Sequence, residues 1–160
     1  MKKFLFIMSM LAVVVLFTSA SSNNGTGGMV GTMASDFTVT NDDGQLSLKQ
    51  LRGKYVLLTL WSSADVSSRL DNIRCDRYAA EQADVVLVSV NFDRSKALFD
   101  ELVAADGLDS STQYYCERQD RSVFEQKWGG SQQYNTYLID SRGVVIAVNP
   151  SDKELMSAIK

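Results

Sequence analysis

The sequence predicts one layered α/β domain with a central mixed sheet flanked by helices. Two nearly continuous apolar runs, 55–61 and 84–91, are typical of strands covered on both faces. A segment with helical spacing of apolar residues follows each run. Two further strands near the C-terminus are joined by the turn Ser141–Gly143. Alternating strands and helices of this kind define the α/β class.

The first part of the domain is predicted to be a β-hairpin followed by a helical turn. Residues 37–40 alternate between apolar and polar, and the turn sequence Asn41–Gly44 follows them. The alternation resumes at 46–48, and 47–53 reads as one helical turn closed by a glycine. The apolar strand 55–61 comes next.

A helix over 66–82 is predicted from Val66, Leu70 and Ile73, which we expect to form its buried face. Because crossover connections are right-handed, this helix should join two neighbouring parallel strands, 55–60 and 84–90. We expect strand 135–140 to run antiparallel beside strand 55–60. The remaining predicted elements are helices over 95–105, 121–128 and 152–160 and strands over 113–116 and 144–148.

Composition excludes several classes of function. The chain has no histidine, so a Ser–His–Asp triad, a Cys–His pair and a histidine-ligated metal site are impossible. Its two cysteines are too few for a zinc site built on several thiolates. The net charge of −3 and the lack of a basic cluster argue against a nucleic-acid partner. We expect no cofactor and no metal.

The N-terminus has the pattern of an export signal. Lys2 and Lys3 precede an apolar run over 4–17, and the small residues 18–20 follow. The run is shorter than the roughly 20 apolar residues of a membrane span. We therefore expect a signal peptide over 1–20, which would contact a membrane only during export to the periplasm or cell envelope. Residues 21–32, rich in Ser, Asn and Gly, are predicted to be a flexible linker before a domain over 33–160.

Several short motifs, in order, resemble the redoxin group of thioredoxin-like proteins. They are Ala34–Phe37, Asp43-Gly44, Leu51–Leu58, Trp61, Tyr137–Asp140 and Gly143–Ile146. This group includes periplasmic thiol-disulfide oxidoreductases and peroxidases of the alkyl hydroperoxide reductase and thiol-specific antioxidant type. The resemblance implies a thioredoxin fold with an N-terminal hairpin and with an inserted helix and strand, which 95–116 would supply.

The site that carries chemistry in this group is altered here. Members have Cys-x-x-Cys just after the strand that ends in Trp61. In this sequence Asp65 stands at the position of the attacking cysteine and Ser68 at that of the resolving one. The cis-proline that the resemblance implies is also absent, and Tyr134 takes its place. A carboxylate cannot form a mixed disulfide, so the usual exchange chemistry is lost.

Two interpretations of this altered site remain open. Asp65 can be a simple N-cap of the helix that follows it. Alternatively, Asp65, Ser67, Ser68 and Arg69 form a polar recognition patch. Trp61 and Tyr134 complete the set of candidate binding residues.

The remaining cysteines, Cys75 and Cys116, are candidate redox thiols. Helical spacing places Cys75 off the apolar stripe, whereas alignment to the redoxin group places it in the core, and we favour the core. Cys116 should end the inserted strand at the other end of the helix from Cys75, too far for a disulfide. We expect the two thiols to be unpaired.

Two functions follow from these observations. The first is an exported, redox-inactive module that binds another envelope protein or an extended peptide. The alternative is an enzyme, a divergent thiol-disulfide oxidoreductase or peroxidase that uses Cys75 or Cys116. A lone cysteine without a histidine or second cysteine nearby lacks the usual activators, which favours the binding module.

Overall fold

The computed structural model of the chain describes residues 28–129 and 133–159. The signal peptide predicted over 1–20 therefore lies outside the described residues. The described part is built on a five-stranded sheet with the order β5-β4-β3-β6-β7. Strands β3 (Tyr55–Trp61), β4 (Val85–Asn91) and β5 (Gln113–Tyr115) run parallel, and β6 (Thr136–Ile139) and β7 (Val145–Val148) complete the sheet with antiparallel pairings. This confirms the predicted α/β class and the two predicted neighbours of the 55–60 strand.

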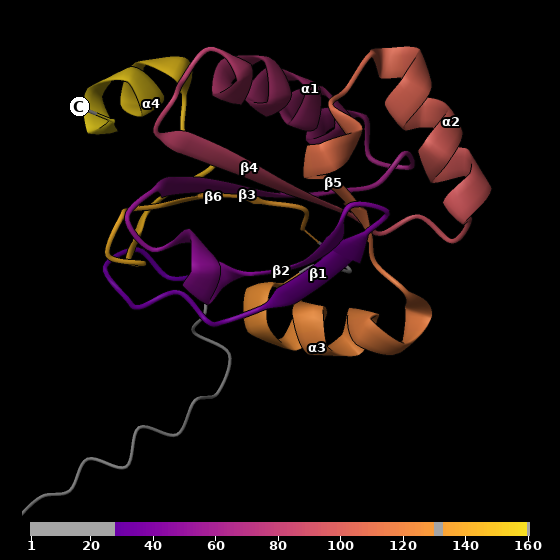
Figure 1. Cartoon of the computed structure of the whole chain (residues 1–160), viewed down its shortest axis with the longest axis horizontal. Helices are drawn as coiled ribbons and strands as arrows, with labels where there is room; N and C mark the ends of the chain where they lie inside the picture. The colour runs from indigo at the N-terminus through magenta and orange to yellow at the C-terminus, as the bar shows by residue number, and fades with distance from the viewer. Residues whose placement is uncertain (1–27, 130–132, 160) are drawn as a thin grey trace, which may run out of the picture.

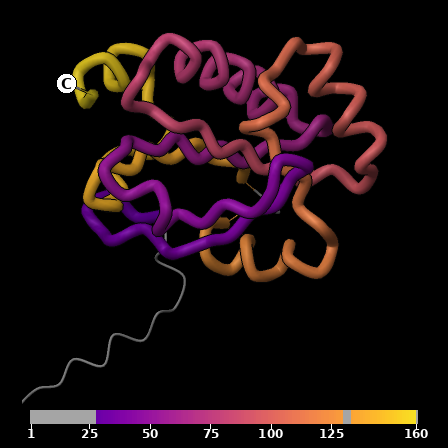
Figure 2. The backbone as a smooth tube through the Cα atoms, viewed as in Figure 1, coloured from indigo at the N-terminus to yellow at the C-terminus, as the bar shows by residue number. Residues whose placement is uncertain are grey.

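Helices cover both faces of the sheet, as Figures 1 and 2 show. Helices α1 (Val66–Ala80), α2 (Lys96–Asp106) and α4 (Asp152–Ala158) lie on one side. Helix α3 (Arg118–Trp128) lies on the other side, next to the hairpin formed by β1 (Thr38–Asn41) and β2 (Gly44–Ser47). Short 3-10 turns η1 (Leu48–Leu51) and η2 (Ser110–Thr112) precede β3 and β5. The predicted hairpin and the predicted inserted helix and strand (α2 and β5) are thus both present.

The core consists of two layers because successive side chains of a strand point to opposite faces. Val56, Leu58 and Leu60 of β3 pack with Phe37, Phe124 and other side chains beneath the hairpin and α3. Leu57 points the other way and packs with Cys75 and Leu155 beneath α1 and α4. Both faces of β3 are covered, which is why its sequence is almost continuously apolar.

Helix α1 does not bury the face that its apolar spacing predicts. Val66 and Leu70 are 69% and 61% exposed, and the buried residues of the helix are Ser68, Asn72 and Cys75. The predicted helix is confirmed and the placement of Cys75 in the core is right. Of the predicted stripe, Val66 and Leu70 lie outside the core and Ile73 is half-buried. The first half of the buried face is polar and is held by hydrogen bonds, whereas Cys75, Tyr78 and Ala79 in the second half pack against apolar side chains.

Asn72 is the centre of those hydrogen bonds. Its Oδ1 accepts from Thr59 Oγ1 at 3.0 Å and from Ser89 Oγ at 2.6 Å, and its Nδ2 donates to Gln113 Oε1 at 3.1 Å. These three partners belong to β3, β4 and β5, and all four side chains are buried. One residue of α1 therefore bonds to three adjacent strands, and a buried network that is fully paired specifies one arrangement of the helix on the sheet.

Contacts with the sheet begin before Met33. Gly31 N–H donates to Val145 O at 2.8 Å, and Val145 N–H donates to Thr32 O at 3.0 Å, so this segment extends the sheet beyond β7. Met33 forms an isolated bridge with Val144. Among the described residues, no helix is both long and apolar enough to cross a membrane.

Candidate functional site

The first turn of α1 is closed by its own side chains. Asp65 Oδ1 accepts a hydrogen bond from Ser68 N–H at 2.8 Å, which makes Asp65 the N-cap of the helix. Ser68 Oγ donates to Asp65 O at 3.0 Å and accepts from Ser62 N–H at 3.3 Å. The side chain of Ser68 is buried beneath the turn. The residues at the two cysteine positions thus form a helix cap that also ties α1 to the end of β3.

A groove of about 640 Å³ opens beside this capped turn. One wall is the outer face of α1, and the other consists of the segment before β6 and the loop between β7 and α4. Most of the lining side chains are polar. The lining residues are Asp65, Ser67, Ser68, Leu70, Asp71, Arg74, Gln133, Tyr134, Asn135, Asn149 and Pro150.

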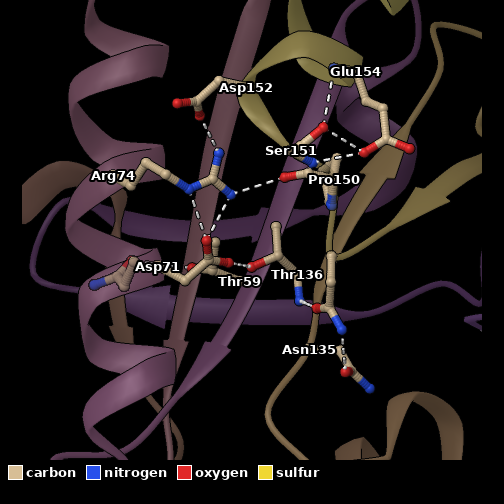
Figure 3. Close-up of polar contacts among 11 residues, drawn as sticks. Thr59, Asp71, Arg74, Asn135, Thr136, Pro150, Ser151, Asp152 and Glu154 are labelled. Carbon is tan, nitrogen blue, oxygen red and sulfur yellow. Dashed lines mark hydrogen bonds and ion pairs between the residues drawn. The ribbon is translucent and has the colours of Figure 1, made fainter.

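Arg74 joins the two walls at one end of the groove (Figure 3). Its guanidinium donates twice to Asp71 Oδ1, at 2.6 and 2.8 Å, and once to Asp152 Oδ1 at 2.6 Å. A further bond of 3.0 Å goes to Pro150 O. Thr136 Oγ1 donates to the second oxygen of Asp71. Burial opposes the charge of Arg74, but the bonds to these two carboxylates outweigh it and raise the pKa of the guanidinium.

The loop between β7 and α4 is held against β6 by Asn149. Its Oδ1 accepts from Thr136 N–H at 2.9 Å, and its own N–H donates to Thr136 O at 2.7 Å. Its Nδ2 donates to Asn135 Oδ1 at 2.9 Å. Asn149 has a φ of 51°, the left-handed region that asparagine tolerates better than most residues. The described residues contain no cis peptide bond, so this wall of the groove is built from trans backbone and amide side chains.

The structure brings four of the six predicted binding residues to the groove: Asp65, Ser67, Ser68 and Tyr134. The other two lie elsewhere. Trp61 is fully buried against Phe99, and Arg69 makes a two-bond ion pair with Asp106 of α2 at 2.6 and 2.8 Å. Trp61, the last residue of β3, points under α2, and Arg69 lies on the side of α1 that faces α2, so neither side chain lines the groove.

Several lining residues were missed in the sequence. Leu70, Asp71 and Arg74 follow Ser67 at helical spacings of three, four and seven, so the helix period contained the signal for them. Leu70 was missed because it was predicted to belong to the buried face of the helix. Asn149 and Pro150 had no such signal, because only the folded sheet brings this loop beside α1.

The two cysteines are unpaired, as expected, and both are buried. Cys75 packs beneath α1 and α4, whereas Cys116 packs in the layer beneath the hairpin and α3, on the opposite face of the sheet. Burial raises the pKa of the Cys75 thiol to about 12, with a further increase from the charge of Asp71. Burial likewise raises the pKa of Cys116 to about 11. Neither thiol lines the groove.

A second buried polar cluster lies where β3 and β4 end. Asp93 Oδ1 accepts from Ser62 Oγ at 2.6 Å, Ser63 N–H at 2.9 Å and Ser63 Oγ at 3.0 Å, and Asn91 Nδ2 donates to Oδ2 at 3.0 Å. Burial favours the neutral form of Asp93, but these hydrogen bonds outweigh it and lower its pKa. These donors together stabilise a fixed negative charge on Asp93 at the ends of β3 and β4.

No family model and no curated protein matches this chain. Solved structures do. A thioredoxin-like protein from Parabacteroides distasonis is 28% identical, with a TM-score of 0.63 over 69% of this chain and 82% of its own. The thioredoxin domain of a thiol-disulfide oxidoreductase from Bacteroides vulgatus is 19% identical, with a TM-score of 0.69 over 82% and 95%. A thiol:disulfide interchange protein from Bacteroides sp. is 18% identical, with a TM-score of 0.68 over 83% and 89%.

These similarities extend over 69% to 83% of this chain. The chain has a thioredoxin-like fold, and its structural neighbours include thiol-disulfide oxidoreductases. The predicted fold family is therefore confirmed.

Proposed function

We propose that this chain is an exported thioredoxin-like module that performs no disulfide exchange and binds an extended peptide segment of an envelope protein. The observation that carries the proposal is the hydrogen-bonded cap made by Asp65 and Ser68. Disulfide exchange needs a thiolate at the start of this helix, where the helix dipole stabilises negative charge. Asp65 places a negative charge there, but a carboxylate cannot attack a disulfide.

The two cysteines offer no substitute. A reactive thiol is partly exposed and has a lowered pKa, whereas Cys75 and Cys116 are 0% and 5% exposed and have raised pKa values. They lie on opposite faces of the sheet, so neither can resolve a mixed disulfide formed by the other. This arrangement argues against the alternative of a divergent oxidoreductase or peroxidase.

The groove has the surfaces that an extended peptide requires. The exposed amide side chain of Gln133 lines one wall and can exchange hydrogen bonds with a peptide backbone. Asn135 and Asn149 line the same wall, but their amides already bond within the chain and shape the wall instead. Leu70 is 61% exposed on the opposite wall, where an apolar side chain of a peptide would cover it.

Export rests on the N-terminal pattern. Two lysines, an apolar run and small residues in that order are typical of a secretory signal, and the resulting location would supply envelope proteins as partners. N-terminal sequencing of the protein from an envelope fraction should find a start near Ser21. An intact Met1 in that fraction would refute the proposal of cleavage.

The proposed loss of redox chemistry is tested with the mature chain in an insulin-reduction assay and in an assay of oxidation of a reduced peptide. We expect background rates in both. A matched variant carrying Cys75→Ser and Cys116→Ser should give the same rates. Robust turnover that this variant lacks would establish the enzyme alternative instead.

Peptide binding is tested by selecting a displayed library of random peptides on the mature chain and on a Leu70→Arg variant. We expect the selected peptides to lose binding to Leu70→Arg and to keep binding to Leu98→Arg, a matched change of an exposed leucine on α2 outside the groove. Peptides that bind Leu70→Arg and the unchanged chain equally would show that the groove is not the binding site.

A further inference from the structure

A second groove lies at the β5 edge of the sheet, where the β1–β2 hairpin on one face meets α2 on the other. Its volume is about 510 Å³, within the range of sites for small molecules. It shares no lining residue with the groove beside Asp65. The second groove is therefore a separate surface from the one proposed to bind a peptide.

The floor of this groove is apolar and aromatic. Phe99 and Val103 of α2 line it and are 6% and 8% exposed, and Leu108 and Tyr115 complete it. The rings of Phe99 and Tyr115 have centroids 5.8 Å apart and are tilted by 43°. Phe99 rests in turn on the buried ring of Trp61, with centroids 6.1 Å apart. A ligand with an apolar body would find a packed surface here.

The rim of the groove is acidic. Asp42 and Asp43, at the tip of the hairpin, lie on one side, and Asp100 of α2 also lines the groove. Asp100 pairs with Lys96 at 2.8 Å, whereas Asp42 and Asp43 form no ion pair within residues 28–129 and 133–159. Three carboxylates against one ammonium leave the rim negative. This excess charge is complementary to a cation.

A side chain of the protein, Lys96, already places such a cation in the groove. Lys96 Nζ lies 6.0 Å from the centroid of the Phe99 ring while it binds Asp100. An ammonium over an aromatic face gains from the negative charge of the ring's π-system. The floor and rim therefore already hold one alkylammonium group, at the end of Lys96.

The acidic wall is held in place by the fold. Asn41, at the start of the hairpin turn, donates from Nδ2 to Ser111 O at 3.0 Å and to Ser110 O at 3.4 Å. These bonds join the hairpin to η2, the turn that leads into β5. A wall that is positioned before a ligand arrives loses little entropy on binding.

We propose that this groove binds a small organic cation, an amine or alkylammonium compound whose apolar part lies on Phe99, Val103 and Leu108. Its positive charge faces Asp42 and Asp43, the carboxylates that lack an ion pair. Its apolar part displaces water from the aromatic floor. The proposal assigns a ligand class to a surface outside the groove beside Asp65.

The first test is an NMR titration of the mature ¹⁵N-labelled chain with hexylammonium, hexanol and hexanoate, which share one apolar body and differ in charge. We expect hexylammonium to bind most tightly and hexanoate least tightly, with the largest shifts at Phe99, Val103, Leu108 and Tyr115. Equal affinity for hexylammonium and hexanol, or shifts that fall in the groove beside Asp65, would overturn the proposal.

Variants then test the rim and the floor separately. Asp42→Asn with Asp43→Asn should weaken hexylammonium binding about fivefold, the effect expected from two exposed carboxylates, and should leave hexanol unchanged. Glu81→Gln, a neutralised exposed carboxylate outside the groove, is the matched control and should have no effect.

Lys96→Met should tighten hexylammonium binding because it removes the competing ammonium. Ala104→Gln should weaken the binding of all three probes because the longer side chain fills part of the groove. Asp42 and Asp43 lie in an exposed turn, so this double variant should keep its fold. Unchanged affinity of the double variant for hexylammonium would refute the proposal.

Discussion

Asn149 and Thr136 are joined by two hydrogen bonds, one from Thr136 N–H to the Asn149 side chain and one from Asn149 N–H to Thr136 O. The pair connects the loop after β7 to the first residue of β6. It sets the shape of one wall of the groove, since Asn149 lines that wall and its Nδ2 also holds Asn135. The left-handed φ of Asn149 is thus stabilised by contacts on both its backbone and its side chain.

This pair predicts an order of stabilities among variants of Asn149. Asn149→Ala should lower the free energy of unfolding by about 2 kcal/mol, because Thr136 N–H loses its acceptor and alanine is strained at positive φ. Asn149→Gly loses the acceptor but not the backbone freedom, so it should cost about 1 kcal/mol less than alanine. Asn149→Asp keeps the acceptor for Thr136 N–H and loses only the bond from Nδ2 to Asn135, so it should be less destabilised than Asn149→Ala. Urea denaturation of the four proteins measures the order, and a glycine variant less stable than the alanine variant would contradict it.

The network around Asn72 predicts a rescue by multiple substitution. Asn72→Leu should destabilise the protein by about 3 kcal/mol, because hydroxyl groups of Thr59 and Ser89 are left buried without their partner. Adding Thr59→Val and Ser89→Ala removes those stranded hydroxyls and should recover part of the loss. Thermal or urea unfolding of the single and triple variants tests this. No recovery in the triple variant would mean that packing volume, not hydrogen bonding, dominates at this position.

The thiols predict a simple count in a reaction with a colorimetric disulfide reagent at neutral to mildly alkaline pH. Without reductant, the denatured protein should show two free thiols, because Cys75 and Cys116 are unpaired. The native protein should react slowly at both, since burial hides the sulfur atoms and raises both pKa values. The Cys75→Ser and Cys116→Ser single variants assign each rate. A fast thiol in the native protein would revive the enzyme hypothesis.

Asp93 predicts a loss of stability in acid. Its pKa is lower in the folded protein than in the unfolded chain, so the stability it contributes is present above the unfolded value of about 4 and is lost as the pH falls through the folded value. Asp93→Asn should therefore have a flatter dependence of unfolding free energy on pH below about 4. Asp140→Asn should flatten the same pH dependence, because hydrogen bonds from the backbone and from Arg142 outweigh burial and lower the pKa of Asp140 as well. Parallel pH profiles of Asp93→Asn and the unchanged chain would contradict this account.

The helix start predicts that a dithiol can be restored. Asp65→Cys with Ser68→Cys places two thiols at the first turn of α1, where the helix dipole lowers a thiol pKa. The substitution removes the N-cap and should cost about 1 kcal/mol of stability. We expect measurable but low insulin reduction, because Tyr134 does not reproduce the cis-proline that the resemblance implies. Asp65→Ala with Ser68→Ala controls for the loss of the cap and should remain inactive.

Sequence patterns predicted the fold well and the site in part. The runs of β3 and β4 are apolar because both faces of these strands are buried, and that signal is local in the sequence. Helix α1 was predicted as an element, but its buried face was not, because Asn72 is buried through hydrogen bonds to three strands that no helical wheel represents. Asn149 and Pro150 reached the groove only through the antiparallel pairing of β6 with β7, a contact that local patterns do not contain.

The hydrogen bonds that Asn72 makes beneath α1 have a consequence for which residues on the outer face of the helix can change. A helix with an apolar inner face is held on its sheet by the burial of apolar surface, which does not fix its rotation. Here Asn72 fixes the rotation of α1 about its axis through directional bonds, and the outward residues such as Ser67 and Leu70 add little to folding. Exposed residues on the outer face of α1 can therefore be exchanged one at a time while the helix keeps its orientation on the sheet.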